Sequence, residues 1–232
     1  MAFLSPTGRI EFARRVAVLA CMSAAIAFAD GYAPRLIAAG FAGVAYLWPG
    51  VPRPPGTLRM ARVQAVILPD LLGFALIGFF FGLPFLIGGG DLHPSAWLLW
   101  PMAGLFTALP MLAAVSSAFG LRLEEQGPQI DTWRRCTRLG WGDIASAKPH
   151  RRGLPVWLRR LAPVLAAGNP TASGAILLAR DSTGTELTTR DGRRFVIPRE
   201  GFEQGHAALL RVLAAQGLSP ARNGKTHEGA SK

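Results

Sequence analysis

Four apolar stretches alternate with short polar intervals in the first half of the chain, between residues 16 and 119. Two of them, 71–87 and 95–119, contain no charged residue. Each approaches or exceeds the roughly 20 residues that a helix needs to cross a hydrocarbon core about 30 Å thick. The two earlier stretches are short for a full crossing, which predicts a thin or tilted helical hairpin. The pattern therefore predicts an α-helical membrane anchor (16–120) of four transmembrane helices, at about 16–29, 34–48, 63–87 and 95–119.

The arginines of this half lie mainly on one side of the predicted helices. Three precede the first helix and three separate the second from the third, whereas the other two intervals carry Asp30 and Asp91. Cytoplasmic loops carry an excess of Lys and Arg. This predicts a multi-pass protein of the bacterial cytoplasmic (inner) membrane with both termini, including residues 1–15, in the cytoplasm. One bent helix over 16–48 is the alternative, and the same rule disfavours it because the first arginines would then lie opposite the second basic interval.

Charge and composition agree with an anchor joined to a basic module. The 232 residues are 50% hydrophobic and 17% charged, so the chain is more apolar than a typical soluble protein. Up to Gly120 there are seven Lys or Arg and four Asp or Glu, and eighteen and ten follow, so the net charge of +11 divides as +3 and +8. Nucleic-acid binding also needs a basic face, but Arg-rich cytoplasmic parts of membrane proteins face an anionic leaflet. We therefore expect the lipid bilayer, and not nucleic acid, as a partner.

The sequence nominates no catalytic residue, cofactor site or metal site. Cys21 and Cys136 lie in different predicted media, and the four histidines are too scattered for ligand spacing. The phosphate-binding, dinucleotide-binding, zinc-protease and serine-hydrolase motifs are all missing from the sequence. We therefore expect a non-catalytic protein with no cofactor.

Two features inside the predicted anchor carry hypotheses. Asp70 is the only acidic residue within a predicted span, and an intramembrane carboxylate suggests a proton or cation relay. The alternative, which we favour, is that Asp70 lies near the cytoplasmic boundary and pairs with Arg59 or Arg62. Gly78 and Gly82 form a GxxxG pattern that lets two helix backbones approach closely, either in a homo-oligomer or between two helices of one chain.

After Gly120 the apolar period shortens from helical to alternating, which predicts an α+β domain over 121–217. Turn residues separate the predicted strands, among them 126–128, 182–184 and the Asp191-Gly192 hairpin signal. A helix with one apolar face follows at 202–216 and ends at Gly217. The expected fold is a small antiparallel β-sandwich or barrel capped by this helix. Its predicted strands are 121–125, 129–133, 137–141, 175–180, 186–189 and 194–197.

The segments LRLEEQGPQI, RLGWGDIASAKP and TRDGRRFVIP, followed by the terminal helix, resemble the bacterial pleckstrin-homology-like (PH-like) domains that follow membrane spans. In that family an E-x-G strand pair precedes a W-x-[DE]-I element, which Trp141, Asp143 and Ile144 match. The resemblance implies a cytoplasmic PH-like domain. From the residues alone, we expect Asp143 to cap the turn after the preceding strand.

This chain departs from the family pattern by an insertion at 149–173. The insertion mixes indole, aliphatic and guanidinium groups, which suits a segment lying in the headgroup plane. A disordered loop, or one packed on the module, is the open alternative, because prolines limit helix length. Residues 218–232 have the composition of a disordered tail. The predicted membrane-surface contacts are Arg151, Arg152, Trp157, Arg159 and Arg160.

These observations predict an integral membrane protein that presents a cytoplasmic binding module to a protein partner or to an anionic lipid headgroup. The alternative is a small transporter or channel with a cytoplasmic regulatory domain, in which Asp70 would face a polar cavity between spans.

Overall fold

The computed structural model describes residues 4–27, 31–152 and 182–218. The chain divides into two compact units, Met1–Arg138 and Leu139–Lys232, which are described separately below. The predicted strand at 175–180, most of the insertion and the tail from residue 219 lie outside the described residues.

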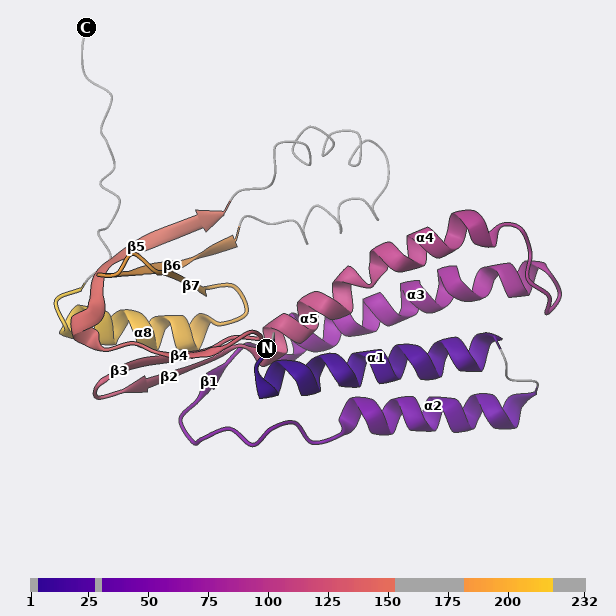
Figure 1. The fold of residues 1–232 in the computed structure, drawn as a ribbon, viewed down its shortest axis with the longest axis horizontal. Coiled ribbons are helices and arrows are strands. Elements are labelled where there is room, and N and C mark those ends of the chain that lie inside the picture. The colour runs from indigo at the N-terminus through magenta and orange to yellow at the C-terminus, as the bar shows by residue number, and fades with distance from the viewer. Residues whose placement is uncertain (1–3, 28–30, 153–181, 219–232) are drawn as a thin grey trace, which may run out of the picture. The chain divides into compact units, whose positions relative to one another are not determined.

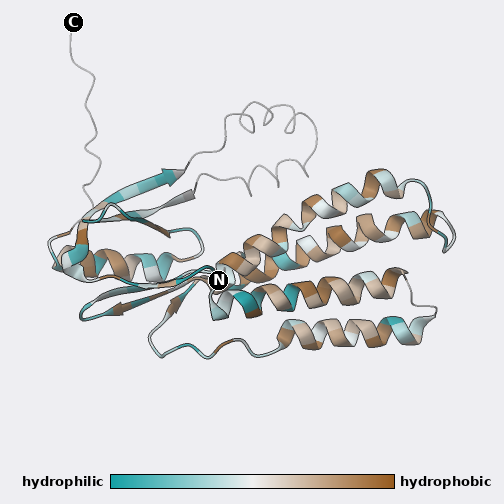
Figure 2. Cartoon of the chain, in the orientation of Figure 1, coloured by the Kyte–Doolittle hydropathy of each residue, from teal (hydrophilic) through white to brown (hydrophobic). Residues whose placement is uncertain are grey.

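The first unit contains the apolar helices (Figure 1). Two helical runs in the described part of the chain, Val63–Ile87 and Ala96–Ala118, are long and apolar enough to span a membrane. Both are largely brown in the hydropathy colouring of Figure 2. The α-helices of this unit are α1 (Pro6–Ala27), α2 (Tyr32–Leu47), α3 (Leu68–Ile87), α4 (Ala96–Phe106) and α5 (Ala108–Ala118).

Helix α1 begins ten residues before the predicted first span. The Ser5 side chain starts the helix, because its Oγ accepts a hydrogen bond from the Gly8 N–H at 3.0 Å, and Pro6 suits the first helical position. The Ser5 N–H also donates to the Trp133 carbonyl at 2.9 Å, which ties this end of α1 to the loop after the third strand of the sheet described below. The early start places Glu11 and the arginines that precede the apolar stretch inside the helix.

Prolines shape the last two helical runs. Pro69 has no N–H to donate to the preceding turn, and the residues before it form a π-helical turn, η1 (Val63–Ile67), in which the Leu68 N–H bonds to the Val63 carbonyl. The predicted span 95–119 is interrupted at Thr107, three residues before Pro110. There the Thr107 Oγ donates to the Gly104 carbonyl at 2.6 Å.

Glycines on α3 allow close packing within the unit. A Cβ at Gly73 would lie 3.0 Å from the Leu109 side chain and closer still to the Pro110 ring of α5. A Cβ at Gly78 would meet the Met22 side chain at 3.1 Å, and one at Gly82 would meet Ile26 at 3.4 Å. The GxxxG pattern therefore faces α1 of the same chain, which is the intrachain alternative of the two that the sequence left open.

A four-stranded antiparallel sheet completes the first unit, in the order β1-β2-β3-β4. The sequence did not predict β1, which comes from the interval between α2 and α3 and pairs Leu58 with Leu121. The predicted turn at 126–128 is shifted, because Gly127 and Pro128 lie in β3 and Glu124 pairs with Gly127. The strands are β1 (Leu58–Arg59), β2 (Gly120–Glu124), β3 (Gly127–Asp131) and β4 (Cys136–Arg138).

The second unit is a three-stranded antiparallel sheet with one helix, and α8 lies along the sheet (Figure 1). The hairpin at Asp191-Gly192 is confirmed, with Gly192 at φ 81° and its N–H bonded to the Thr189 carbonyl. The predicted joint at 182–184 is wrong, because these residues pair with β5 and open β6. The elements are β5 (Ile144–Arg152), β6 (Ser182–Thr189), β7 (Arg194–Pro198) and α8 (Glu203–Ala215).

Buried side chains of the second unit come from both its sheet and its helix. Leu187, Ile197, Leu209 and Leu213 are fully buried, as is Phe202 just before α8. The buried His206 Nε2 lies 2.9 Å from the Thr185 Oγ, which joins α8 to β6.

The predicted W-x-[DE]-I element forms a short 3₁₀ turn, η2 (Trp141–Asp143), directly before β5. The Asp143 carboxylate accepts a hydrogen bond from the Gly140 N–H at 3.2 Å, so its predicted capping role is confirmed. Ile144 follows as a buried residue of β5.

Candidate functional site

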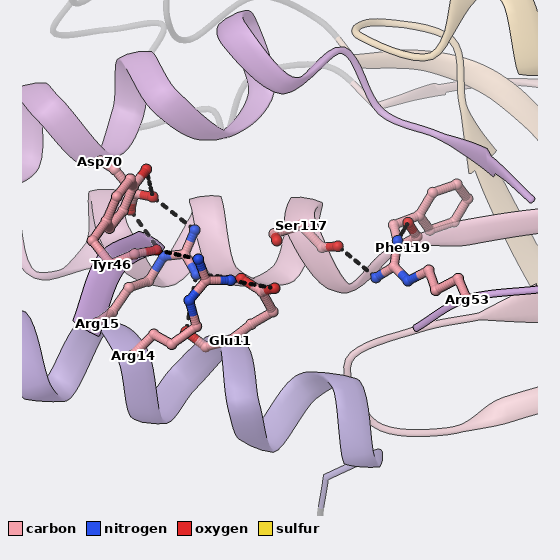
Figure 3. Close-up of polar contacts among 8 residues, drawn as sticks. All are labelled: Glu11, Arg14, Arg15, Tyr46, Arg53, Asp70, Ser117 and Phe119. Carbon is pink, nitrogen blue, oxygen red and sulfur yellow. Dashed lines mark hydrogen bonds and ion pairs between the residues drawn. The ribbon is translucent and has the colours of Figure 1, made fainter. Parts of the chain in front are cut away.

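A buried ionic cluster joins α1, α2 and α3 (Figure 3). Arg15 and Asp70 are 4% and 1% exposed, and they form a two-bond ion pair with Nε–Oδ1 at 2.9 Å and Nη2–Oδ2 at 2.7 Å. The Tyr46 hydroxyl donates to the same carboxylate at 2.9 Å. Such a bidentate guanidinium–carboxylate pair fixes both side chains in one geometry.

Glu11 extends this cluster along α1. Its carboxylate accepts from Arg15 Nη1 at 2.9 Å and from Arg14 Nη1 at 3.1 Å. Arg14 also donates to the Tyr46 carbonyl, and its guanidinium lies 5.9 Å from the centroid of the Tyr46 ring. Two carboxylates thus face two guanidiniums, so the cluster is neutral.

The structure corrects the predicted pairing of Asp70. Its partner is Arg15 of α1 and not Arg59 or Arg62, because α1 begins at Pro6 and carries Arg15 into the helix bundle. Two signals in the sequence point to this arrangement, namely the i,i+4 spacing of Glu11 and Arg15 and the helix start at Ser5-Pro6.

A cavity of about 480 Å³ lies beside the cluster, within the first unit. We call it the basic cavity, because five of its lining residues are arginines and only one, Glu11, is a carboxylate. It is formed by the first half of α1, the end of α2 and the loop after it, the start of the Val63–Ile87 helix and the end of α5. Its arginines are Arg14, Arg15, Arg53, Arg59 and Arg62.

Arg53 closes the end of α5. Its guanidinium donates to the Ser117 carbonyl at 2.7 Å and to the Phe119 carbonyl at 3.3 Å (Figure 3), the groups that a helix leaves unpaired at its carboxyl end. Burial, and then the neighbouring Arg59 guanidinium, lower the pKa of Arg53. Both effects make the positive charge of Arg53 less favourable in the cavity.

Arg59 and Arg62 supply the exposed part of this charge. Arg59 lies on β1, where its backbone pairs with Gly120, and Arg62 precedes the turn η1. Both side chains are exposed, and neither forms an ion pair with another residue of the described ranges 4–27, 31–152 and 182–218. Guanidiniums without a carboxylate partner are available to bind phosphate or carboxylate oxygens.

The residues that were predicted to contact the membrane surface lie elsewhere in the chain. Arg151 is exposed and belongs to β5, as does Arg152, whereas Trp157, Arg159 and Arg160 lie outside the described residues. The structure therefore does not bring these five residues together as a described site. In the described part of the chain, no three His, Cys, Asp or Glu side chains are grouped so as to hold a metal ion.

No known protein family, characterised protein or solved structure matches this chain. The interpretation of the basic cavity as a binding site therefore rests on its geometry.

Proposed function

We propose that this chain is a non-catalytic integral protein of the bacterial inner membrane that binds an anionic lipid headgroup in the basic cavity. In this proposal four helical passes anchor the chain, both termini are cytoplasmic, and the carboxy-terminal α+β part is a PH-like module available to a protein partner. The observation that carries the proposal is a single cavity lined by five guanidiniums and one carboxylate, in which Arg53, Arg59 and Arg62 lie outside the neutral cluster. Basic pockets at the cytoplasmic ends of membrane helices bind anionic headgroups.

The direction of the helices supports this topology. The start of α1, the end of α2, the start of the Val63–Ile87 helix and the end of α5 all line the same cavity, so the four passes alternate in direction. At 1.5 Å per residue, the 22 residues of α1 extend about 33 Å and the 16 residues of α2 about 24 Å. The shorter α2 fits the tilted or thin hairpin that the sequence predicts.

The position of the cavity at the ends of the helices favours a lipid ligand. Trp48 directly follows α2, is 61% exposed and lines the cavity together with the arginines. Indole and guanidinium groups at the ends of membrane helices prefer the headgroup region. The negative potential of the cytoplasmic leaflet adds about 1 kcal/mol of attraction for each Lys or Arg near the surface.

The pairing of Asp70 favours this binding role over the transport alternative. A proton or cation relay needs a carboxylate that can release its partner, whereas Asp70 is held by Arg15 and Tyr46 and is 1% exposed. Asp70 also does not line the basic cavity.

Thermal unfolding of the full chain in an uncharged detergent tests the proposal. Added phosphatidylglycerol is compared with phosphatidylcholine of the same acyl chains. A ligand at about 100 times its Kd stabilises the folded state by about 2.7 kcal/mol, which for a chain of this size raises Tm by about 5 to 11 °C. We expect this rise with phosphatidylglycerol alone.

The variant Arg59→Gln/Arg62→Gln should lose most of the rise. A matched control, Arg190→Gln/Arg211→Gln, removes the same charge from exposed side chains of the second unit and should keep it. Equal Tm values with the two lipids would refute the proposal. A loss confined to the control would move the headgroup site to the second unit.

A further inference from the structure

We infer that the basic cavity selects a doubly charged phosphate, the phosphomonoester headgroup of a membrane lipid, over the singly charged phosphodiester of most anionic lipids. This inference rests on the proposed function and adds the class of ligand to it. It is carried by the charges that remain in the cavity after all internal ion pairs are counted.

The five arginines of the cavity fall into two sets. Arg14 and Arg15 are balanced by Glu11 and Asp70, with N–O distances of 2.7 to 3.1 Å. The second set comprises Arg53, Arg59 and Arg62. Arg53 bonds to backbone carbonyls, which carry no net charge.

Three positive charges are therefore left without a compensating carboxylate among the residues that line the cavity. A phosphodiester, with one negative charge, leaves two of them uncompensated. A phosphomonoester carries about −1.5 to −2 at pH 7 and leaves about one. Burial, and then the Arg59 guanidinium, lower the pKa of Arg53, although Glu11 and Asp131 act in the opposite direction. The repulsion between Arg53 and Arg59 decreases most with the more highly charged ligand.

One nitrogen of the inner set has no acceptor within the described residues. The Nε of Arg14 is buried and has no hydrogen-bond partner among the described residues, although Arg14 lines the cavity. A phosphomonoester has three terminal oxygens, compared with two in a phosphodiester, so it has one more acceptor for the arginines of the cavity.

The backbone positions of the three outer arginines are defined by neighbouring elements. Arg59 is held by the pairing of β1 with β2, and Arg62 by the start of the 25-residue helix Val63–Ile87. Arg53 is held by its bonds to the end of α5. The three arginines therefore come from separate segments of the chain, and all three line the same cavity.

The remaining cavity wall favours a lipid over a soluble phosphate ester. Leu47, Trp48, Met60 and Val66 line the cavity, and two of them belong to the helices α2 and Val63–Ile87. These apolar groups provide contact for the glycerol and upper acyl region of a lipid but nothing for inorganic phosphate.

Equilibrium binding to the full chain in neutral nanodiscs tests the inference. The probes are fluorescent phosphatidic acid, phosphatidylglycerol and phosphatidylcholine with identical acyl chains, and glycerol 3-phosphate as the soluble competitor. We expect phosphatidic acid to bind about tenfold more tightly than phosphatidylglycerol at pH 7.5. At pH 5.5 the second phosphate proton returns, so the preference should fall to about twofold. Arg59→Gln/Arg62→Gln should remove it at both pH values, and Arg190→Gln/Arg211→Gln should leave it unchanged.

Each other result has a definite meaning. Equal affinities for phosphatidic acid and phosphatidylglycerol, both above that for phosphatidylcholine, would overturn the selection of a dianion and leave the proposed function intact. Equal affinities for all three lipids would overturn both. Glycerol 3-phosphate that competes as strongly as phosphatidic acid would show that the ligand is a soluble phosphate ester, which overturns the lipid assignment.

Discussion

Removing the charge of Asp70 should destabilise the helical unit strongly. Asp70→Asn keeps the shape of the side chain but ends its ion pair with Arg15, which is 4% exposed. Breaking a buried ion pair by removing one partner is unfavourable by about 3–5 kcal/mol in soluble proteins. Glu11 still bonds to Arg15 at 2.9 Å in this variant, so we expect a loss of about 3 kcal/mol, at the lower end.

Two further variants separate charge from hydrogen bonding. Tyr46→Phe removes a single hydrogen bond to Asp70, at 2.9 Å, and should lower the free energy of unfolding by about 1 kcal/mol. The double variant Arg15→Met/Asp70→Leu replaces the ion pair by apolar groups. It should be more stable than the sum of the single replacements predicts, by about 2 kcal/mol, because neither charge is then left alone.

Unfolding of the full chain in mixed micelles, followed by tryptophan fluorescence during sodium dodecyl sulfate titration, measures these differences. Hydrogen bonds between membrane helices average only about 0.6 kcal/mol in double-mutant cycles. If Asp70→Asn loses no more than that, or if the effects of the double variant are additive, the cluster does not hold the helices together and the reasoning is wrong.

Three other outcomes follow from single contacts. Gly73→Val should lower stability by about 1–3 kcal/mol in the same titration, because its side chain would overlap the Pro110 ring, whereas a change of 0.5 kcal/mol or less would contradict this packing. Burial, and then Asp131, raise the pKa of the Cys136 thiol to about 11 from an ordinary 9.0. Alkylation of Cys136 at pH 8 should therefore be about 100-fold slower than alkylation of an ordinary thiol, and Asp131→Asn should make it faster. Mass spectrometry of the labelled peptide measures both rates. Burial lowers the pKa of His206 below 6.5, so its contribution to stability is complete above pH 6.5 and decreases as the pH falls through the folded pKa. In His206→Gln, the protection of α8 amides from hydrogen exchange should depend less on pH.

Elements with strong local signals were predicted well from the sequence. The predicted span at 63–87 is helical over the same residues, as expected of a long apolar run with few charges. The helix predicted at 202–216 is observed as Glu203–Ala215, and the Asp191-Gly192 hairpin is observed where its turn residues placed it. In these segments the residues that determine the element are neighbours in the chain.

Features that depend on distant residues were not predicted. Strand β1 has only two residues, Leu58 and Arg59, and exists because β2 pairs with it across about sixty residues of chain. The first turns of α1 are polar, and hydropathy alone assigned them to the cytoplasmic flank. They join the bundle because Asp70 on α3 accepts hydrogen bonds from the buried Arg15 and, at the same carboxylate, from the Tyr46 hydroxyl of α2.

The candidate site was missed for the same reason, because its residues come from distant parts of the chain. The site contains one group of residues that acts on stability and another that acts on binding. The neutral cluster around Arg15 and Asp70 satisfies buried charges, so changes there act on stability. Arg59 and Arg62 are exposed and bond to no carboxylate in the described residues, so replacing them should change affinity for an anion and leave the free energy of unfolding within about 0.5 kcal/mol. Arg53 contributes to both binding and stability, because it lines the cavity and its guanidinium also bonds to a carbonyl at the end of α5. A variant of Arg53 alone therefore cannot distinguish binding from folding, whereas the Arg59 and Arg62 pair can.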